Sequence, residues 1–314
     1  MENQYNDSDY VLVTEGISKF YKSQRVLSNV SMHVKKGDIY GFVGENGAGK
    51  TTIIRIVTGL IFPESGSYQL FGVNSDDKEI SQVRRKISAI VESPSIYLNM
   101  SAHENLKMQM RMLGLPVDEE KVADLIKIVG LEGVSRKKHA DKFSLGMRQR
   151  LGIAICLVAD PEFLILDEPL NGLDPEGIVN MRNLILKLNK ERGITFLISS
   201  HILTELALVA TSYGIISRGE LVKEISSEDL KDIETKQTHI KTTDNEKAFA
   251  ILKQHVKSDI LDYKDGEIIL LGEIDINDII KYFMEEAIAI IDIKTTESSF
   301  EDYYLSIVGG VRNA

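Results

Sequence analysis

The sequence predicts an α/β fold over about the first 220 residues, followed by a smaller α+β domain. The first observation is a glycine-rich stretch, residues 44–52, which follows an apolar strand pattern and precedes a helical one. The second is the apolar run Phe163–Leu166, which ends in the adjacent carboxylates Asp167 and Glu168. The third is a change in charge: residues 221–314 carry 11 Lys and Arg against 20 Asp and Glu, a net charge of −9 out of −10 for the whole chain. A chain of 314 residues can bury two cores of this kind.

The glycine-rich stretch has the spacing of a phosphate-binding P-loop. Its glycines let the backbone turn N–H groups toward an anion, and the N-terminus of the next helix adds partial positive charge. Lys50 would reach the β- and γ-phosphates, Thr51 would hold Mg²⁺, and Thr52 would bond a phosphate nearer the sugar. The expected nucleotide contacts are Gly44, Asn46, Gly47, Ala48, Gly49, Lys50, Thr51 and Thr52. By itself the loop implies only that a nucleotide binds.

Composition and charge argue against a membrane-spanning, secreted or nucleic-acid-binding protein. Hydrophobic residues make up 43% and charged residues 27%, which is typical of a soluble globular chain. The apolar run Leu151–Ala159 is far shorter than the roughly 20 residues of a membrane helix. The N-terminus lacks the basic flank and apolar run of a signal peptide, so we expect a cytosolic protein. The acidic tail would repel nucleic acid, and the single cysteine, Cys156, lies in an apolar helical pattern as core filler rather than nucleophile.

The strands around the P-loop follow from alternating or continuous apolar residues. Tyr21 falls on an expected loop, residues 19–22, where it could stack on a nucleobase or simply pack at a strand end. Glu92 follows the last of these strands. The expected strands are residues 10–13, 26–34, 39–43, 67–72 and 86–91.

Helical patterns follow. Residues 122–129 keep the spacing of one buried helical face. A cluster of methionines nearby is either adaptable core or a soft surface that grips a partner helix. Its members are Met100, Met108, Met110 and Met112.

Two further stretches carry chemistry. Asp167 and Glu168 stand at the C-terminal end of a strand, where sites in open α/β sheets lie. Asp167 would hold Mg²⁺ through water, and Glu168 would orient and polarise the attacking water. The stretch 143–150 opens the helix that contains Cys156 with a Ser/Gly start, which is either an anion contact or a plain N-cap. His201 ends the strand 194–200, where a histidine can be structural or catalytic.

The order of these motifs across residues 10–220 resembles the ATP-binding cassette (ABC) ATPase family. The resemblance implies a P-loop NTPase fold: a RecA-like core with an antiparallel β subdomain and a helical subdomain. It implies that Tyr21 stacks on adenine and that His201 senses the γ-phosphate. It also implies a head-to-tail cassette dimer, in which Ser144 and Gly146 contact the γ-phosphate of ATP held by the other subunit and Asp174 lies between the two sites.

Three departures from the usual family pattern narrow the resemblance. The signature reads Phe143–Met147 where Leu-Ser-Gly-Gly-Gln is usual, the next loop begins Asn171-Gly172, and Glu92 stands in place of a glutamine. Together with residues 174–177 they resemble the subgroup that exports, or confers immunity to, bacitracin-like and lantibiotic peptides. Glu92 would serve as a catalytic and metal-facing residue beside Thr51 and Asp167, or it would turn to solvent or to a partner.

Residues 221–314 have their own pattern. The expected order is strand 238–242, helix 245–256, strand 260–263, a turn at 265–266, strand 268–271, helix 276–286 and strand 288–293. This βαββαβ order is ferredoxin-like, without cysteine ligands for an iron–sulfur cluster. Residues 298–305 resemble the terminal helix of similar transporter ATPases.

The resemblance therefore implies an ATP-binding, ATP-hydrolysing subunit that energises a membrane exporter. It would dimerise with itself or a paralogue and lie on the cytoplasmic face of the membrane through a permease on a separate chain. The alternative is a soluble ABC-type ATPase acting on ribosomes or DNA. Such proteins usually carry two cassettes or a long coiled coil, and this chain has neither a second P-loop nor sustained heptads.

Overall fold

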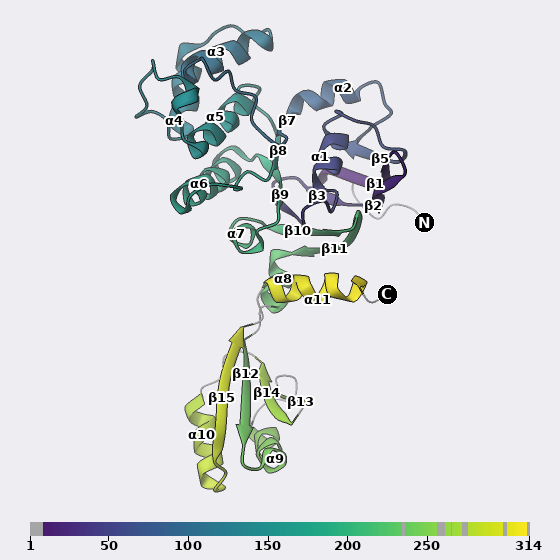
Figure 1. Ribbon diagram of the computed structural model, residues 1–314, viewed down its shortest axis with the longest axis vertical. Coiled ribbons are helices and arrows are strands. Elements are labelled where there is room, and N and C mark those ends of the chain that lie inside the picture. Colours follow the sequence, from purple (N-terminus) through teal and green to yellow (C-terminus); the bar gives the residue numbers. More distant parts are fainter. Residues whose placement is uncertain are drawn as a thin grey trace. The chain divides into compact units, whose positions relative to one another are not determined.

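The computed structural model describes residues 9–233, 236–255, 261–264, 266–271, 276–297 and 300–312. The chain divides into two compact units between Ser227 and Glu228 (Figure 1). The boundary expected after Glu220 would instead cut through β11 (Glu220–Ser226), which pairs antiparallel with β10 (Ser212–Ser217). Because β11 is hydrogen-bonded into the larger unit, that unit continues to the end of this strand.

The larger unit contains a six-stranded sheet in the order β11-β10-β4-β9-β8-β7. All neighbours except β10 and β11 are parallel. All five residues of β4 are buried, as expected for a central strand that is covered on both faces. The parallel strands end at one edge, so the segments that follow β4, β8 and β9 lie side by side. The four strands not yet given bounds are β4 (Ile39–Val43), β7 (Ile87–Ile90), β8 (Phe163–Asp167) and β9 (Thr195–Ser200).

A second, antiparallel sheet has the order β2-β1-β5-β6, and β3 also pairs with β1. The expected loop at residues 19–22 is wrong for its first three residues, which continue β1 and pair with β2 as far as Tyr21↔Gln24. The expected strand 26–34 is interrupted at residues 31–32, because the Thr14 hydroxyl donates to Val30 O and accepts from Met32 N. The strands are β1 (Tyr10–Tyr21), β2 (Gln24–Val30), β3 (His33–Lys35), β5 (Ser65–Leu70) and β6 (Val73–Asn74).

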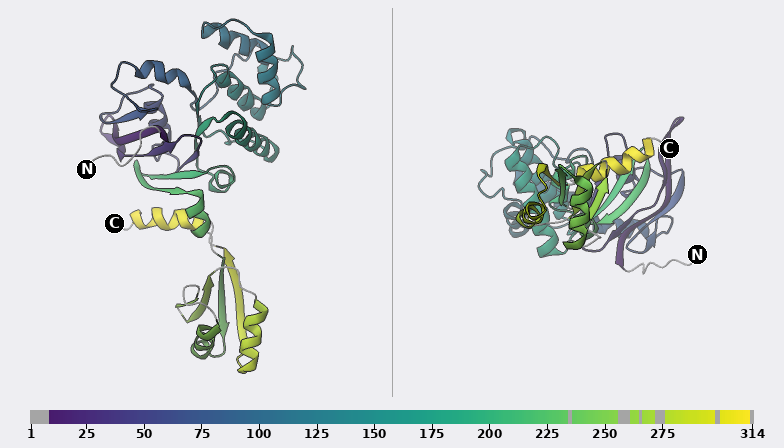
Figure 2. Two further views of the ribbon diagram at one scale, coloured as in Figure 1. Left: turned by 180° about the vertical axis from the view of Figure 1, so that it is seen from behind. Right: turned by 90° about the horizontal axis from the view of Figure 1, so that it is seen from below.

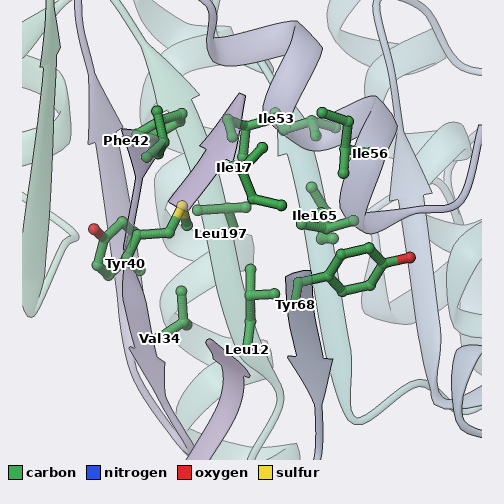
Figure 3. Packing of buried hydrophobic residues seen from close by; sticks show 14 of the residues in the cluster. Leu12, Ile17, Val34, Tyr40, Phe42, Ile53, Ile56, Tyr68, Ile165 and Leu197 are labelled. Carbon is green, nitrogen blue, oxygen red and sulfur yellow. The ribbon is translucent and has the colours of Figure 1, made fainter. Parts of the chain in front are cut away.

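The core of this unit lies between the two sheets, around α1 (Lys50–Val57) (Figure 3). α1 contributes Ile53 and Ile56, both fully buried. Apolar side chains from the two sheets complete the cluster: Leu12, Ile17, Val34, Tyr40, Phe42, Tyr68, Ile165 and Leu197. Burial on this scale fixes the start of α1 beneath the P-loop.

Three helices form a lobe apart from the antiparallel sheet in both views, α3 (Ala102–Met112), α4 (Glu119–Ile128) and α5 (Leu145–Leu157) (Figures 1 and 2). α3 begins with a capping box between Ser101 and Glu104. The methionine cluster divides: Met110 is buried in the lobe, whereas Met112 is 63% exposed. Met110 is therefore core, and a partner surface at Met112 stays a prediction.

α5 packs closely against the segment after β7. A Cβ added at Gly152 would lie 2.4 Å from the Pro94 side chain, so only glycine fits there. The Ser88 hydroxyl also donates to Cys156 O at 3.0 Å. These contacts fix the loop that carries Glu92 against the helical lobe. The remaining helices of the larger unit are α2 (Ile80–Val83), η2 (Arg84–Lys86), η3 (Ala140–Lys142), α6 (Pro175–Arg192) and α7 (Leu203–Ala207).

The smaller unit has the expected βαββαβ order, between α8 (Ser227–Ile233) and α11 (Phe300–Arg312). Its four strands form an antiparallel sheet in the order β13-β14-β12-β15, and α9 and α10 pack on a core that includes Ile240, Leu252 and Phe283. The expectations for Val256, Ile260, Asp265 and residues 298–299 lie outside the described residues. Its elements are β12 (Lys236–Thr242), α9 (Asn245–His255), β13 (Leu261–Lys264), β14 (Glu267–Leu271), α10 (Ile276–Glu285) and β15 (Ile290–Glu297).

Within the described part of the chain, no helix is both long enough and apolar enough to cross a membrane.

Candidate active site

The P-loop connects β4 to α1 through a turn that requires glycine. Gly49 has φ +110° and Gly47 has φ +82°, which side-chain-bearing residues rarely adopt. A Cβ at Gly44 would lie 2.4 Å from Ile216 O, so the loop also needs glycine where it crosses β10. Asn46 and Gly47 are exposed at the tip, whereas Ala48 is buried below it. The helix begins at Lys50, earlier than the sequence pattern indicated, so its first N–H groups belong to the loop motif.

Lys50 is buried, with 5% of its surface exposed. Its Nζ donates to Gly44 O at 2.6 Å and lies 3.2 Å from Glu168 Oε1. Glu168 Oε1 is within ion-pair distance of this cation but has no hydrogen-bonding partner of suitable geometry among the described residues. The ammonium therefore curls back onto its own loop and onto the carboxylate.

Asp167 ends β8 and is 5% exposed. Thr51 donates its hydroxyl to Asp167 Oδ2 at 2.9 Å, and Ser199 donates to Asp167 Oδ1 at 2.5 Å. Ser199 belongs to β9, directly opposite Asp167 in the sheet. A hydroxyl and a buried carboxylate are hard oxygen donors, which fit Mg²⁺. The structure thus brings Thr51 and Asp167 into contact, and their role as a metal site stays a prediction.

Glu168 follows β8 in a left-handed conformation, with φ +50°. Its N–H is held by Ser199 O at 3.2 Å and Ser199 Oγ at 2.9 Å. Its second carboxylate oxygen, Oε2, lies 2.8 Å from Nδ1 of His201, the residue after β9. A strained backbone held by two hydrogen bonds aims this carboxylate between a buried lysine and a half-exposed histidine.

Glu92 does not join the expected metal residues. Its carboxylate forms an ion pair with Arg55 of α1 at 2.5 Å, and its side chain is 64% exposed. Nowhere in the part of the chain that the structure describes do three His, Cys, Asp or Glu side chains come close enough to hold a metal ion. The ion pair with Arg55 explains why Glu92 lies apart from Thr51 and Asp167, because the guanidinium already neutralises its carboxylate.

A pocket of about 360 Å³ connects Glu92 with the other motifs. Glu168 lines it, together with Leu145 and Gln149 of α5 and Asn171 of the following loop. The loop after β7, the end of β8 and the start of α5 therefore share one cavity.

Ser144 and Asp174 are both helix N-caps. Ser144 Oγ accepts from Met147 N at 3.2 Å, and Asp174 Oδ1 accepts from Gly177 N at 3.1 Å. Both residues are exposed, as is Leu145. At Gly146 an added Cβ would meet no atom closer than 3.7 Å, so glycine is not required by packing within this chain.

Tyr21 is the last residue of β1 and is 43% exposed. The Nζ of Lys19 lies 5.8 Å from the centre of its ring, on an exposed hairpin end. Thr52, the last of the expected phosphate contacts, is buried in the first turn of α1.

Two residues of this site could not be predicted from the sequence. Ser199 holds both Asp167 and Glu168, and only the pairing of β8 with β9 brings it there. Arg55 of α1 forms an ion pair with Glu92. The position of Glu92 after a strand does not indicate this partner. The parallel register of the two strands was the one signal available for Ser199.

A glycine-rich loop, a buried lysine and a paired carboxylate at the edge of a parallel sheet define a nucleotide-binding site of the P-loop NTPase class. Residues 27–171 match the family profile described as "ABC transporter". The chain belongs to the ABC transporter ATPases, the ATP-binding and ATP-hydrolysing subunits of these transporters.

Two transport ATP-binding proteins match this chain over most of their own length. It is 43% identical over 304 residues to the Bacitracin transport ATP-binding protein BcrA of Bacillus licheniformis, covering 96% of this chain and 98% of that protein. It is 43% identical over 214 residues to the Lantibiotic transport ATP-binding protein SrtF of Streptococcus pyogenes, covering 68% of this chain and 90% of that protein. Among solved structures, the ADP conformation of the cassette MJ1267 is 25% identical, with a TM-score of 0.64, covering 71% of this chain and 94% of that one.

Proposed function

We propose that this protein powers a membrane exporter of peptide antibiotics of the bacitracin or lantibiotic kind. The main support is the 43% identity with a bacitracin transport ATP-binding protein over 96% of the chain, a span that includes the smaller unit. The transport role of the relatives supports a membrane permease on a separate chain as its partner. We place the protein on the cytoplasmic face of the membrane, bound to that permease.

For the nucleotide we propose that Tyr21 stacks on adenine and that the loop from Gly44 to Gly49 cradles the phosphates. Lys50 would move from Gly44 O to the β- and γ-phosphates, since a phosphate offers it more negative charge than a carbonyl. Thr52 would bond a phosphate nearer the sugar. Mg²⁺, held by Thr51 and through water by Asp167, would offset the phosphate charge when bound.

For hydrolysis we propose that Glu168 orients and polarises the attacking water as general base. His201, 2.8 Å from Glu168, would hold the other side of that carboxylate and contact the γ-phosphate. Glu92 would approach the metal only after leaving Arg55.

We further propose a head-to-tail dimer, either of this chain or with a paralogue. Ser144 and Gly146 at the exposed start of α5 would contact ATP held by the other subunit, and Asp174 would lie between the two sites. Gly146 supports this proposal because no contact among the described residues demands a glycine there.

The test pairs the protein with its genomic neighbour. Co-expression with the adjacent membrane-protein gene in a bacitracin-sensitive bacterium should raise the minimum inhibitory concentration of bacitracin or of a lantibiotic. The matched control is the same pair carrying Glu168→Gln, which should give no protection. Unchanged sensitivity to both peptides, with the two proteins expressed and co-purifying as an active ATPase, would contradict the proposed substrate class.

A further inference from the structure

The ion pair between Arg55 and Glu92 joins the P-loop helix to the loop after β7. Arg55 lies four residues after Thr51 on α1, one turn further along the same face. Its guanidinium is 2.5 Å from Glu92 Oε1. Glu92 has φ +63°, a conformation that costs energy for any residue except glycine, so the structure around it imposes this position.

Glu92 is nevertheless a close neighbour of the carboxylate pair along the sheet edge. Ile90 pairs with Leu166, so the residues that follow them, up to Glu92 and Glu168, leave the sheet side by side. Glu92 and Glu168 line the same pocket. Glu92 therefore belongs to the same sheet edge as Asp167 and Glu168, with its carboxylate paired to Arg55.

An acidic group at this edge has opposite effects on the two forms of the nucleotide. The carboxylate repels the phosphates of metal-free ATP, whereas it attracts the divalent cation of metal-bound ATP. A Glu92 carboxylate that faced the nucleotide would therefore make nucleotide binding depend more strongly on the metal.

We propose that Arg55 is a positioning residue that holds Glu92 back from the nucleotide site until Mg²⁺ and ATP arrive together. This inference rests on the proposed roles of Glu92 and of the P-loop. Once the metal is present, it competes with Arg55 for the carboxylate, and the loop after β7 is released from α1. Because this loop is packed against α5 through Pro94 and Gly152, the exchange of partners would be felt by the helical lobe.

A purely structural role would look different. Both side chains are substantially exposed, at 37% for Arg55 and 64% for Glu92, so the pair contributes little to folding stability. Arg55→Gln should leave the melting temperature nearly unchanged. Its effect should appear in the linkage between metal and nucleotide.

The experiment measures equilibrium binding of a fluorescent, non-hydrolysable ATP analogue with excess EDTA and with saturating Mg²⁺. The proteins are the wild type, Arg55→Gln, Glu92→Gln and the double variant. When residue 92 is glutamate, we expect Arg55→Gln to increase the ratio of the affinity in Mg²⁺ to the affinity in EDTA by about two- to fivefold. This is the range of an exposed ion pair. In the Glu92→Gln background the same substitution should leave the ratio unchanged, and Arg55→Lys should restore most of the wild-type ratio.

The matched control is Arg25→Gln, which breaks another exposed pair, Arg25–Glu220, at 3.2 Å in the same unit. It should leave the ratio at its wild-type value. An equal change on Arg55→Gln in both residue-92 backgrounds would overturn the inference, because Arg55 would then act only as a local cation. If the wild type failed to bind the analogue under either condition, the proposed function itself would be wrong.

Discussion

The carboxylate of Glu168 lies between two nitrogen atoms, with Oε1 3.2 Å from Lys50 Nζ and Oε2 2.8 Å from His201 Nδ1. Lys50 also donates to Gly44 O. The P-loop lysine and the proposed base are thus each other's partners. A γ-phosphate that draws Lys50 away would leave Glu168 with His201 and a water molecule.

Ser199→Ala should impair catalysis without emptying the nucleotide site. The substitution removes the hydrogen bond to buried Asp167 and one of the two that hold Glu168 N, at a cost of about 1–3 kcal/mol in the free energy of unfolding. We expect a clear fall in kcat while ATP analogue binding persists. Ser200→Ala, at the next buried position of β9, is the control. Equal losses of kcat in the two variants would mean that Ser199 does not position the carboxylates.

Truncation after Ser227 should leave a folded cassette that binds ATP. Truncation after Glu220 should not, because it removes almost all of β11 and with it Glu224, which accepts hydrogen bonds from the buried Tyr40 hydroxyl at 2.6 Å and from His33 N at 2.8 Å. Burial of Tyr40, and then the nearby Glu224 charge, raise its pKa well above 10, so the phenol stays a neutral donor. Thermal melting and nucleotide binding of both fragments test this prediction. A stable, binding-competent 1–220 fragment would show that β11 is dispensable.

Glu92→Gln should raise the Mg²⁺ concentration needed for half-maximal ATPase. The substitution removes a negative charge that would attract the metal and repel metal-free ATP, so metal-free ATP affinity should be equal or higher. The effect will be well below the Coulomb value for a buried pair, since Glu92 is largely exposed and starts out paired with Arg55. ATPase titrations against free Mg²⁺ decide the matter. Superimposable curves with unchanged metal-free affinity would mean that Glu92 does not serve the metal.

Cys156 should be unreactive in the folded protein. Burial raises the pKa of its thiol to about 12, although part of the residue remains at the surface. An unfolded thiol has a pKa of about 8.5, so this contribution to stability is complete below that pH and is lost as the pH rises toward the folded value. A thiol reagent at pH 8 should label the protein only after denaturant is added, and not at all in Cys156→Ser. Rapid labelling of the native wild type would contradict this burial.

Local sequence patterns predicted the elements that carry the site. The P-loop, the strand before Asp167 and the Ser144 cap each depend on residues close together in the chain. The order of elements in the smaller unit was also predictable, because each has its own period of apolar residues.

What the sequence could not provide were partners from distant segments. The extension of β1 to Tyr21 depends on pairing with β2 across a hairpin that lacks glycine, with Lys22 at φ +56°. Ser199 reaches Asp167 only through strand register, and Arg55 reaches Glu92 only because α1 packs beside the loop after β7. An ion pair between distant segments leaves no local pattern in the sequence. The pairing of Glu92 with Arg55 could therefore not be predicted.

We propose above all that Glu168 is the general base of ATP hydrolysis. In Glu168→Gln the amide can still accept a hydrogen bond from water, but it cannot take up a proton as the carboxylate does. Binding should be retained or strengthened, because the substitution also removes the anionic partner of Lys50.

The most direct measurement is the steady-state ATPase rate of Glu168→Gln beside its ATP affinity and its oligomeric state in ATP. We predict nearly complete loss of turnover, preserved ATP binding and accumulation of an ATP-bound dimer. Turnover of at least half the wild-type rate would contradict it.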